Sequence, residues 1–295
     1  MSTTIPPVQS QSSPEFLFRG NAVAAGAFVT KLDGKTIGLD PQTVTTHGES
    51  YLPLIGGVSH SLIETPELKF SKFVSYGRCE TFAEGRFDGD LPVTTARASV
   101  NDVLVATSPT ADDNVPDIHS VSFQADSFSL EIQSTYPRGG QPQFKINAVA
   151  PRKMTLVVRN RFDQDVPLPI ALDFDQKLLS FSTLQQMDDE FLGTREFFDE
   201  YTCRFPVAEK LVFGTSKIPR TPQGYIMTSF VRQIRVGDEL ITGNVLTKKG
   251  FGTIQFGLLL ANSLNLRASM AYMKIACDPG GDANFAGAET NGIWK

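Results

Sequence analysis

Apolar and polar residues alternate with a period of two along most of this chain, which is the pattern of half-buried β-strands. In residues 94–107 the apolar positions change phase at Asn101–Asp102. In residues 121–136 they change phase in the same way at Asp126–Ser127. A one-residue change of phase within a strand is typical of a β-bulge. The two segments are therefore predicted to be bulged, curved partners in one sheet.

Strand-like segments also lie on both sides of these two. Residues 16–29 alternate with many small residues, which is typical of a long strand that its neighbours approach closely. Asp33–Gly34 has the composition of a two-residue hairpin turn, because both residues of a type I′ turn need a positive φ. Further strand-like runs cover residues 68–76, 154–162, 210–217, 225–236, 252–261 and 264–277.

The chain shows no change of composition that would divide it into two domains. Many short strands separated by Gly and Pro favour a mainly β fold, with two packed antiparallel sheets in a sandwich or jelly-roll-like arrangement. We predict a single β-rich domain over residues 16–278. Residues 1–15, rich in Ser, Thr, Gln and Pro, are expected to form an extended N-terminal arm, and residues 279–295, rich in Gly, Ala and Asn, a C-terminal tail.

One stretch departs from the strand pattern. Between residues 173 and 201 the apolar residues recur at helical spacing, and Ser182 with Gln185 matches a capping box at a helix start. We therefore predict one short helical segment near residues 178–201. Its apolar face is expected to pack on the sheets, or to form an interface if it is exposed in a monomer. The residues of this face are Leu184, Met187, Phe191, Phe198 and Tyr201.

The polar side of the same segment is strongly acidic. One interpretation makes these carboxylates metal ligands or an acid/base pair, which needs an enclosed site that separates their pKa values. The other treats them as the solvated face of an amphipathic helix, and it is favoured because such charged faces are common. The residues concerned are Asp188, Asp189, Glu190, Glu196, Asp199 and Glu200.

Other catalytic and ligand-binding patterns are missing from the sequence. None of the three histidines lies within four residues of another, and the three cysteines form no C-x-x-C pair, so the spacings of zinc sites are absent. Ser59 and His60 are neighbours, and neighbours on a strand point to opposite faces. Acidic loops at residues 112–117 and 278–284 offer oxygen ligands without a known calcium-site spacing. We expect no enzyme activity, no catalytic residues, no metal and no cofactor.

Charge and hydropathy restrict the partners. A net charge of −5 without a basic cluster argues against nucleic acid. No apolar run approaches the roughly 18 residues of a membrane-spanning helix. The first residues lack the basic and apolar regions of a secretory signal, which predicts a cytoplasmic protein or one exported by a non-classical route. The expected partners are further copies of the chain, in a homo-oligomer, with an apolar ligand as the alternative.

Residues 191–203 (FLGTREFFDEYTC) and 252–279 (GTIQFGLLLANSLNLRASMAYMKIACDP) carry a resemblance. With these segments the chain resembles uncharacterised bacterial β-rich proteins of the choice-of-anchor type. The resemblance implies a β-rich fold and brings no catalytic residues with it. Members typically carry a signal peptide and a C-terminal sorting segment; because neither is seen here, anchoring to a cell surface is not expected.

These observations favour a non-enzymatic structural protein that self-associates through strand edges and terminal arms, with the tail residue Trp294 contacting a neighbour. A first alternative is a carrier that binds an apolar ligand in a cavity lined by some of the 22 phenylalanines. A second is a carbohydrate-active or other hydrolase that uses a pair of Asp or Glu residues in a cleft.

Overall fold

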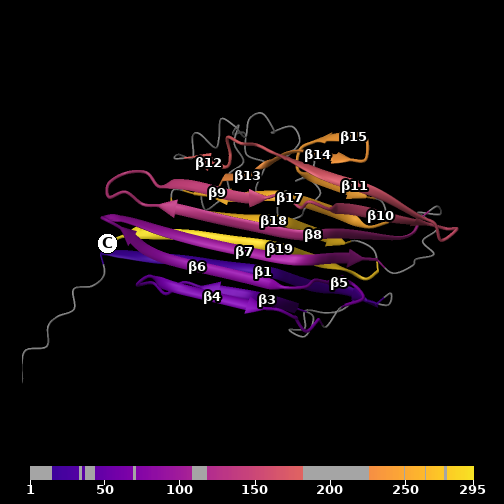
Figure 1. Cartoon of the computed structure of the whole chain (residues 1–295), viewed down its shortest axis with the longest axis horizontal. Coiled ribbons are helices and arrows are strands. Elements are labelled where there is room, and N and C mark those ends of the chain that lie inside the picture. Colours follow the sequence, from indigo (N-terminus) through magenta and orange to yellow (C-terminus); the bar gives the residue numbers. More distant parts are fainter. Residues whose placement is uncertain are drawn as a thin grey trace, which may run out of the picture.

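The structure is a computed structural model, and it describes residues 15–32, 35–36, 44–68, 71–107, 118–181, 226–248, 250–262, 264–275 and 278–295. Within these residues the regular secondary structure consists of β-strands, which form two antiparallel sheets that pack face to face (Figure 1). The predicted mainly β fold with two packed antiparallel sheets is confirmed.

Sheet A contains eight strands in the described part of the chain. They are β1 (Phe16–Leu32), β2 (Lys35–Thr36), β3 (Val44–Tyr51), β13 (Ile226–Ser229), β16 (Val245–Lys248), β17 (Gly252–Ala261), β18 (Asn265–Ile275) and β19 (Gly280–Trp294). Their order is β13-β17-β18-β19-β1-β2, with β16 paired to β17 and β3 paired to β1. The long strands β1, β18 and β19 therefore form the centre of the sheet.

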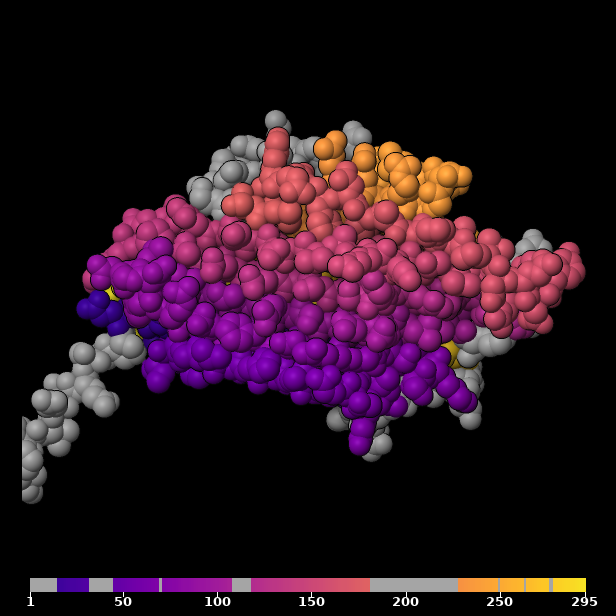
Figure 2. Space-filling view, viewed as in Figure 1, coloured from indigo at the N-terminus to yellow at the C-terminus, as the bar shows by residue number. Residues whose placement is uncertain are grey.

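Sheet B contains eleven strands, again counted over the described residues. They are β4 (Gly57–Ile63), β5 (Val74–Ser75), β6 (Cys79–Asp88), β7 (Leu91–Ala106), β8 (Ile118–Thr135), β9 (Gln143–Val149), β10 (Met154–Asn160), β11 (Asp165–Phe174), β12 (Ser180–Phe181), β14 (Val231–Val236) and β15 (Glu239–Thr242). The main order is β15-β14-β11-β10-β8-β7-β6-β4. Figure 2 shows the outer face of this sheet, with the colour running from purple at the β4 edge to orange at β15.

The C-terminal residues form part of the sheet and are not a tail. Strand β19 pairs with β1 on one side and with β18 on the other. Its small residues permit close packing, because a Cβ at Gly292 would collide with the ring of Phe16 and one at Gly281 would collide with the carbonyl of Phe28. The predicted tail over residues 279–295 is wrong. Their Gly, Ala and Asn content suits a closely packed central strand as well as it suits a tail.

The predicted helical segment is described only at its beginning. Leu178 lies in a turn and is fully buried, and Ser180–Phe181 form β12, which pairs with β9. The other residues of the segment, from 182 to 201, lie outside the described residues.

A large hydrophobic core fills the space between the sheets. Many of its largest side chains are phenylalanines, and their rings contact one another, as Phe123 does with Phe128 and Phe256 at centroid distances of 6.3 and 6.2 Å. A smaller cluster around Phe16 and Phe18 lies at one end. Burial of a large apolar side chain such as these stabilises the folded state by about 1.5–3 kcal/mol.

Hydroxyl groups lie in the interior between the two sheets. Ser50 of β3 and Thr81 of β6 are hydrogen-bonded at 2.8 Å, and Ser134 of β8 and Thr290 of β19 at 2.6 Å. Each pair joins sheet A to sheet B, and each residue is almost fully buried. Each of these four hydroxyl groups thus has a hydrogen-bond partner, and a buried hydroxyl without one would destabilise the folded state.

Strands β7 and β8 change phase as predicted, and they do so together. The inward positions pass from Val100 to Val103 in β7, and from Ala125 to Phe128 in β8. The register continues unchanged across this point, so neither strand carries the extra residue of a bulge. Asp102 instead takes a left-handed φ of 53°, and the two strands share a kink.

Sheet A has a matching kink. Left-handed φ values of 62°, 50° and 64° occur at Gly257 of β17, Ala286 of β19 and Gly48 of β3. The register places these residues on one line across the sheet. Phe285, next to this line, packs on Tyr76, which follows β5, and on Phe128 of β8, at centroid distances of 6.2 and 6.1 Å. The two sheets therefore bend at the same level.

Candidate functional site

Strand β4 forms one edge of sheet B, and among the described strands it shares a backbone ladder with β6 alone. It lies at the lower rim of the molecule in Figures 1 and 2. Val58 and Leu62 point away from the core and are 60% and 43% exposed. Three further apolar side chains of the preceding segment are also exposed. Together, Tyr51, Leu54, Ile55, Val58 and Leu62 are called the β4 edge surface below.

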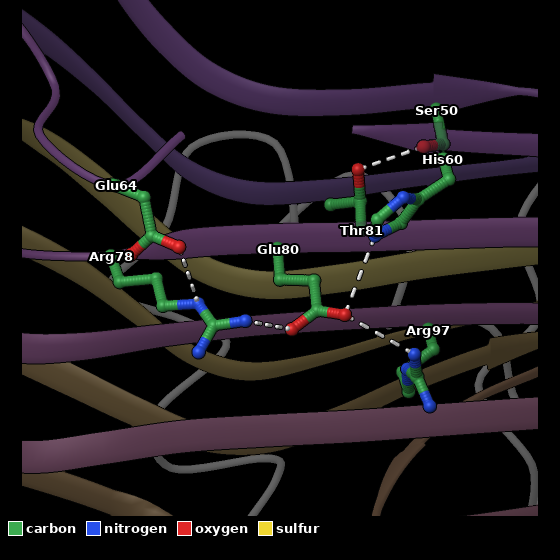
Figure 3. A network of polar contacts seen from close by, with 7 residues as sticks. All are labelled: Ser50, His60, Glu64, Arg78, Glu80, Thr81 and Arg97. Carbon is green, nitrogen blue, oxygen red and sulfur yellow. Dashed lines mark hydrogen bonds and ion pairs between the residues drawn. The ribbon is translucent and has the colours of Figure 1, made fainter. Parts of the chain in front are cut away.

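A network of charged side chains covers the outer face of sheet B beside this surface (Figure 3). Glu80 of β6 accepts from Arg78 at 3.1 Å, lies 3.4 Å from His60 Nε2 of β4, and lies 3.5 Å from Arg97 Nη2 of β7. Glu64 approaches Arg78 at 3.7 Å. Each ion pair is partly exposed and worth at most about 1 kcal/mol. Their common effect is to link β4, β6 and β7 side by side.

The same geometry separates Ser59 from His60. The Ser59 hydroxyl accepts a hydrogen bond from the backbone N–H of Tyr51 at 3.3 Å, whereas His60 faces Glu80 on the outer face of the sheet. A nucleophile and its base must lie within hydrogen-bonding reach of each other. The expectation that these two residues form no catalytic pair agrees with their positions.

The residues predicted to form an apolar helix face, Leu184, Met187, Phe191, Phe198 and Tyr201, lie outside the described residues, so their role stays a prediction. Trp294 is described and is engaged within its own chain. Its indole N–H donates to the Tyr136 carbonyl at 3.0 Å, and its ring lies 5.2 Å from that of Phe16. Arg138 lies over the same indole at 5.2 Å.

A second polar cluster lies on the outer face of sheet A, around Glu289. This carboxylate is only 6% exposed, and it accepts from Asn265 at 2.6 Å and from Arg267 at 2.9 Å. Burial by itself would raise the pKa of Glu289. The Asn265 hydrogen bond and the charge and hydrogen bond of Arg267 outweigh burial, and with a smaller contribution from Arg19 they hold the pKa below its ordinary value. Glu289 is therefore a partnered anion.

The described residues contain few other side chains that could react or bind a ligand. Cys79 is a buried free thiol whose pKa is raised by burial to about 12, so it is a poor nucleophile. Asp102 and Asp126 face each other on β7 and β8 beside Lys153, in a surface hollow of about 530 Å³. Within the described ranges, no three His, Cys, Asp or Glu side chains gather as a metal site, and no helix is long and apolar enough to cross a membrane.

Sequence reasoning missed β4, since residues 57–63 are not among the predicted strand-like runs. The alternation Val58, His60, Leu62 against Ser59 and Ser61 was the available signal. It is short, and its apolar side faces away from the core.

Comparison with known proteins adds nothing to this description of the site, because no family model, no curated protein and no solved structure matches the chain. The resemblance to choice-of-anchor proteins accordingly stays a prediction.

Proposed function

We propose that the protein is a non-enzymatic structural protein that self-associates through the free edge of β4. The observation that carries this proposal is an edge strand that has a backbone ladder on one side only within the described residues and that exposes apolar side chains. Natural proteins usually protect such edges with charge, proline or a covering segment, because unpaired backbone groups readily pair with another chain. Here the exposed apolar residues favour pairing.

The sequence of β4 suits pairing with a second copy of itself. Two antiparallel copies related by a two-fold axis perpendicular to the sheet overlap fully when His60 lies at the axis, because Gly57 and Ile63 are equally distant from it. This register places Val58 opposite Leu62 of the partner subunit, and the same pair recurs on the other side of the axis. Most homodimers have this two-fold symmetry.

The charged network supports the same arrangement. Each His60 stands beside Glu80 of its own chain, so the two imidazoles near the axis are each accompanied by a carboxylate. Arg78 and Arg97 hold that carboxylate in place on the outer face. The dimer would join two copies of sheet B into one continuous sheet and cover the β4 edge surface.

The two alternatives expected from the sequence have less support. The apolar carrier needs a Phe-lined cavity, whereas the described core phenylalanines pack against one another. The hydrolase needs a pair of carboxylates with separated pKa values, whereas Glu80 and Glu289 are each engaged by arginine.

Sedimentation equilibrium of the purified chain tests the proposal. We expect the wild-type protein to show twice the chain mass of 32.2 kDa at micromolar concentrations. The Val58→Lys/Leu62→Lys variant should sediment as a monomer, because four lysines would face one another across the axis. Val166→Lys, at an exposed valine of β11 that four strands of sheet B separate from β4, is the matched control and should keep the wild-type mass. A monomeric wild-type protein, or an unchanged mass in the double variant, contradicts the proposal.

Cysteine cross-linking tests the register. In a chain with Cys203 and Cys277 replaced by serine, His60→Cys should give a covalent dimer under mild oxidation, since directly opposed residues have Cβ atoms about 4.5–5.5 Å apart. Ser61→Cys should give far less, because residue 61 faces Ser59 of the partner subunit. Equal cross-linking of the two variants would rule out an axis at His60.

A further inference from the structure

The outer face of sheet A is hollowed at its centre. A cavity of about 500 Å³ is lined by residues of β1, β17, β18 and β19. A smaller one of about 210 Å³ continues from it, and the two share Tyr272 and Asn284. Glycines open this space: Gly26 of β1 lines the smaller cavity and Gly287 of β19 the larger. The result is an elongated groove across the two central strands.

Hydrogen-bonding side chains line the groove along its length. Ser269 donates to Asn284, and the Tyr272 hydroxyl donates to Asp282 at 2.9 Å. Beyond these, Arg267 and Asn21 both donate to Glu289, at 2.9 and 3.4 Å. These groups are held in place by one another, so a ligand would meet fixed donors and acceptors, which lowers the entropy cost of binding.

The charges and the apolar surface of the groove restrict the ligand. Among the residues that line the groove, Arg267 is the one cation, and it is paired with the buried Glu289 anion; Arg19 acts on the same carboxylate from outside the lining. Asp282 adds an anion at the other end, where it accepts from Tyr272. Aliphatic side chains of Val23, Leu258 and Leu260 alternate with the polar groups. Such a mixed surface suits a ligand that has both apolar faces and many hydroxyl groups.

We infer that this groove binds a neutral oligosaccharide. Sugar hydroxyl groups both donate and accept hydrogen bonds, so they match amide, carboxylate and hydroxyl side chains placed close together. The C–H faces of a sugar ring can lie on Tyr272 and on the aliphatic side chains. Two cavities that meet at Tyr272 and Asn284 fit a chain of linked sugar units better than a single compact molecule. The groove is on the sheet opposite to β4, so this inference is independent of the proposed dimer.

Saturation-transfer NMR with the full chain tests it. The probes are cellotetraose, maltotetraose, laminaritetraose, chitotetraose, mannotetraose and xylotetraose, each at millimolar concentration, with sialyllactose and palmitate as anionic probes. We expect transfer to at least one neutral tetrasaccharide and none to the anionic probes. Absence of transfer to all the tetrasaccharides overturns the inference, and so does stronger transfer to palmitate or sialyllactose.

Two variants locate the site. Gly287→Val fills the larger cavity, and the new Cβ comes nearest to the flexible Asn284 amide at 3.1 Å. It should weaken binding at least tenfold, and so should Tyr272→Ala, which serves as the second variant if circular dichroism shows that Gly287→Val is unfolded. Ser129→Val, on β8 of sheet B, is the control and should bind as the wild type does. Unchanged binding in a folded Gly287→Val or Tyr272→Ala protein overturns the inference.

Discussion

The hydroxyl groups of Ser50 and Thr81 lie between the sheets at 1% and 0% exposure, and they are hydrogen-bonded to each other. Thr81→Val keeps the shape of the side chain but removes the partner of the Ser50 hydroxyl. We expect the free energy of unfolding to fall by about 1–3 kcal/mol, which is the usual cost of an unsatisfied buried polar group. Urea denaturation followed by circular dichroism measures it.

An exposed pair of the same type provides the control for this substitution. Thr247 and Thr253 approach each other at 3.4 Å across β16 and β17 on the surface, so Thr247→Val should change the unfolding free energy by less than about 0.5 kcal/mol. The double variant Ser50→Ala/Thr81→Val should lose less than the sum of its single variants. If Thr81→Val and Thr247→Val lose the same free energy of unfolding, the buried hydrogen bond between the sheets stabilises the protein no more than the exposed one does.

Glu289 makes the stability of the protein depend on pH in a defined direction. Its pKa in the folded protein is lowered below the ordinary value of 4.5, against the effect of burial, by Asn265 and Arg267. The stabilisation from this group is therefore fully present above the pKa of the unfolded chain, and it is lost as the pH falls through the folded value. Glu289→Gln cannot titrate, so its unfolding free energy should fall less steeply than that of the wild type below pH 4.5.

Urea titrations of both proteins at a series of pH values from 3 to 7 give the two slopes. Parallel curves for wild type and Glu289→Gln would show that Glu289 is not held as a partnered anion in the folded protein.

Among the elements, the paired kinks explain why glycine stands at particular positions. Gly48 of β3 has a φ of 64°, and a Cβ there would lie 2.9 Å from that of Ala24 and 3.1 Å from that of Cys79. Gly48→Ala therefore combines an unfavourable backbone conformation with a clash in the core. We expect a loss of at least about 1 kcal/mol of unfolding free energy, since the left-handed region alone costs about 1–2 kcal/mol for a residue with a Cβ.

Gly26→Ala, on the neighbouring strand β1, is the matched control. Its φ is not left-handed, and a Cβ there would meet only the Thr45 carbonyl, at 3.8 Å. It should leave stability close to that of the wild type in thermal and urea denaturation. If the two glycine variants lose the same stability, the kink does not depend on the conformation of Gly48.

The two kinks differ in how visible they are in the sequence. In β7 and β8 the inward Val and Phe residues contrast with Asn, Asp and Ser, so the change of phase can be read directly. In sheet A the kink falls at Ala24–Ala25, Met270–Ala271 and Phe285–Ala286, where both neighbours are apolar or small. Alternation is lost from the sequence there, and only the fold reveals the change of phase.

At the scale of the whole molecule, alternation was enough to predict two packed antiparallel sheets but not which strands are neighbours. The pairing of β19 with β1 joins the two ends of the described chain, and no local pattern encodes such a contact. The groove on sheet A is hidden for the same reason, since Asn21 meets Glu289 only through this pairing. The β4 edge was missed because a seven-residue strand carries a weak signal.

The central position of β19 also affects how the protein is made. During synthesis β1 emerges long before its partner β19, because the other described strands lie between them in the sequence. Until then β1 and β18 each keep an unpaired edge, and such edges are prone to join other chains. A chain that stops before Gly280 would keep both edges open permanently. Synthesis of β19 is thus the step that closes these two edges and removes one route to aggregation.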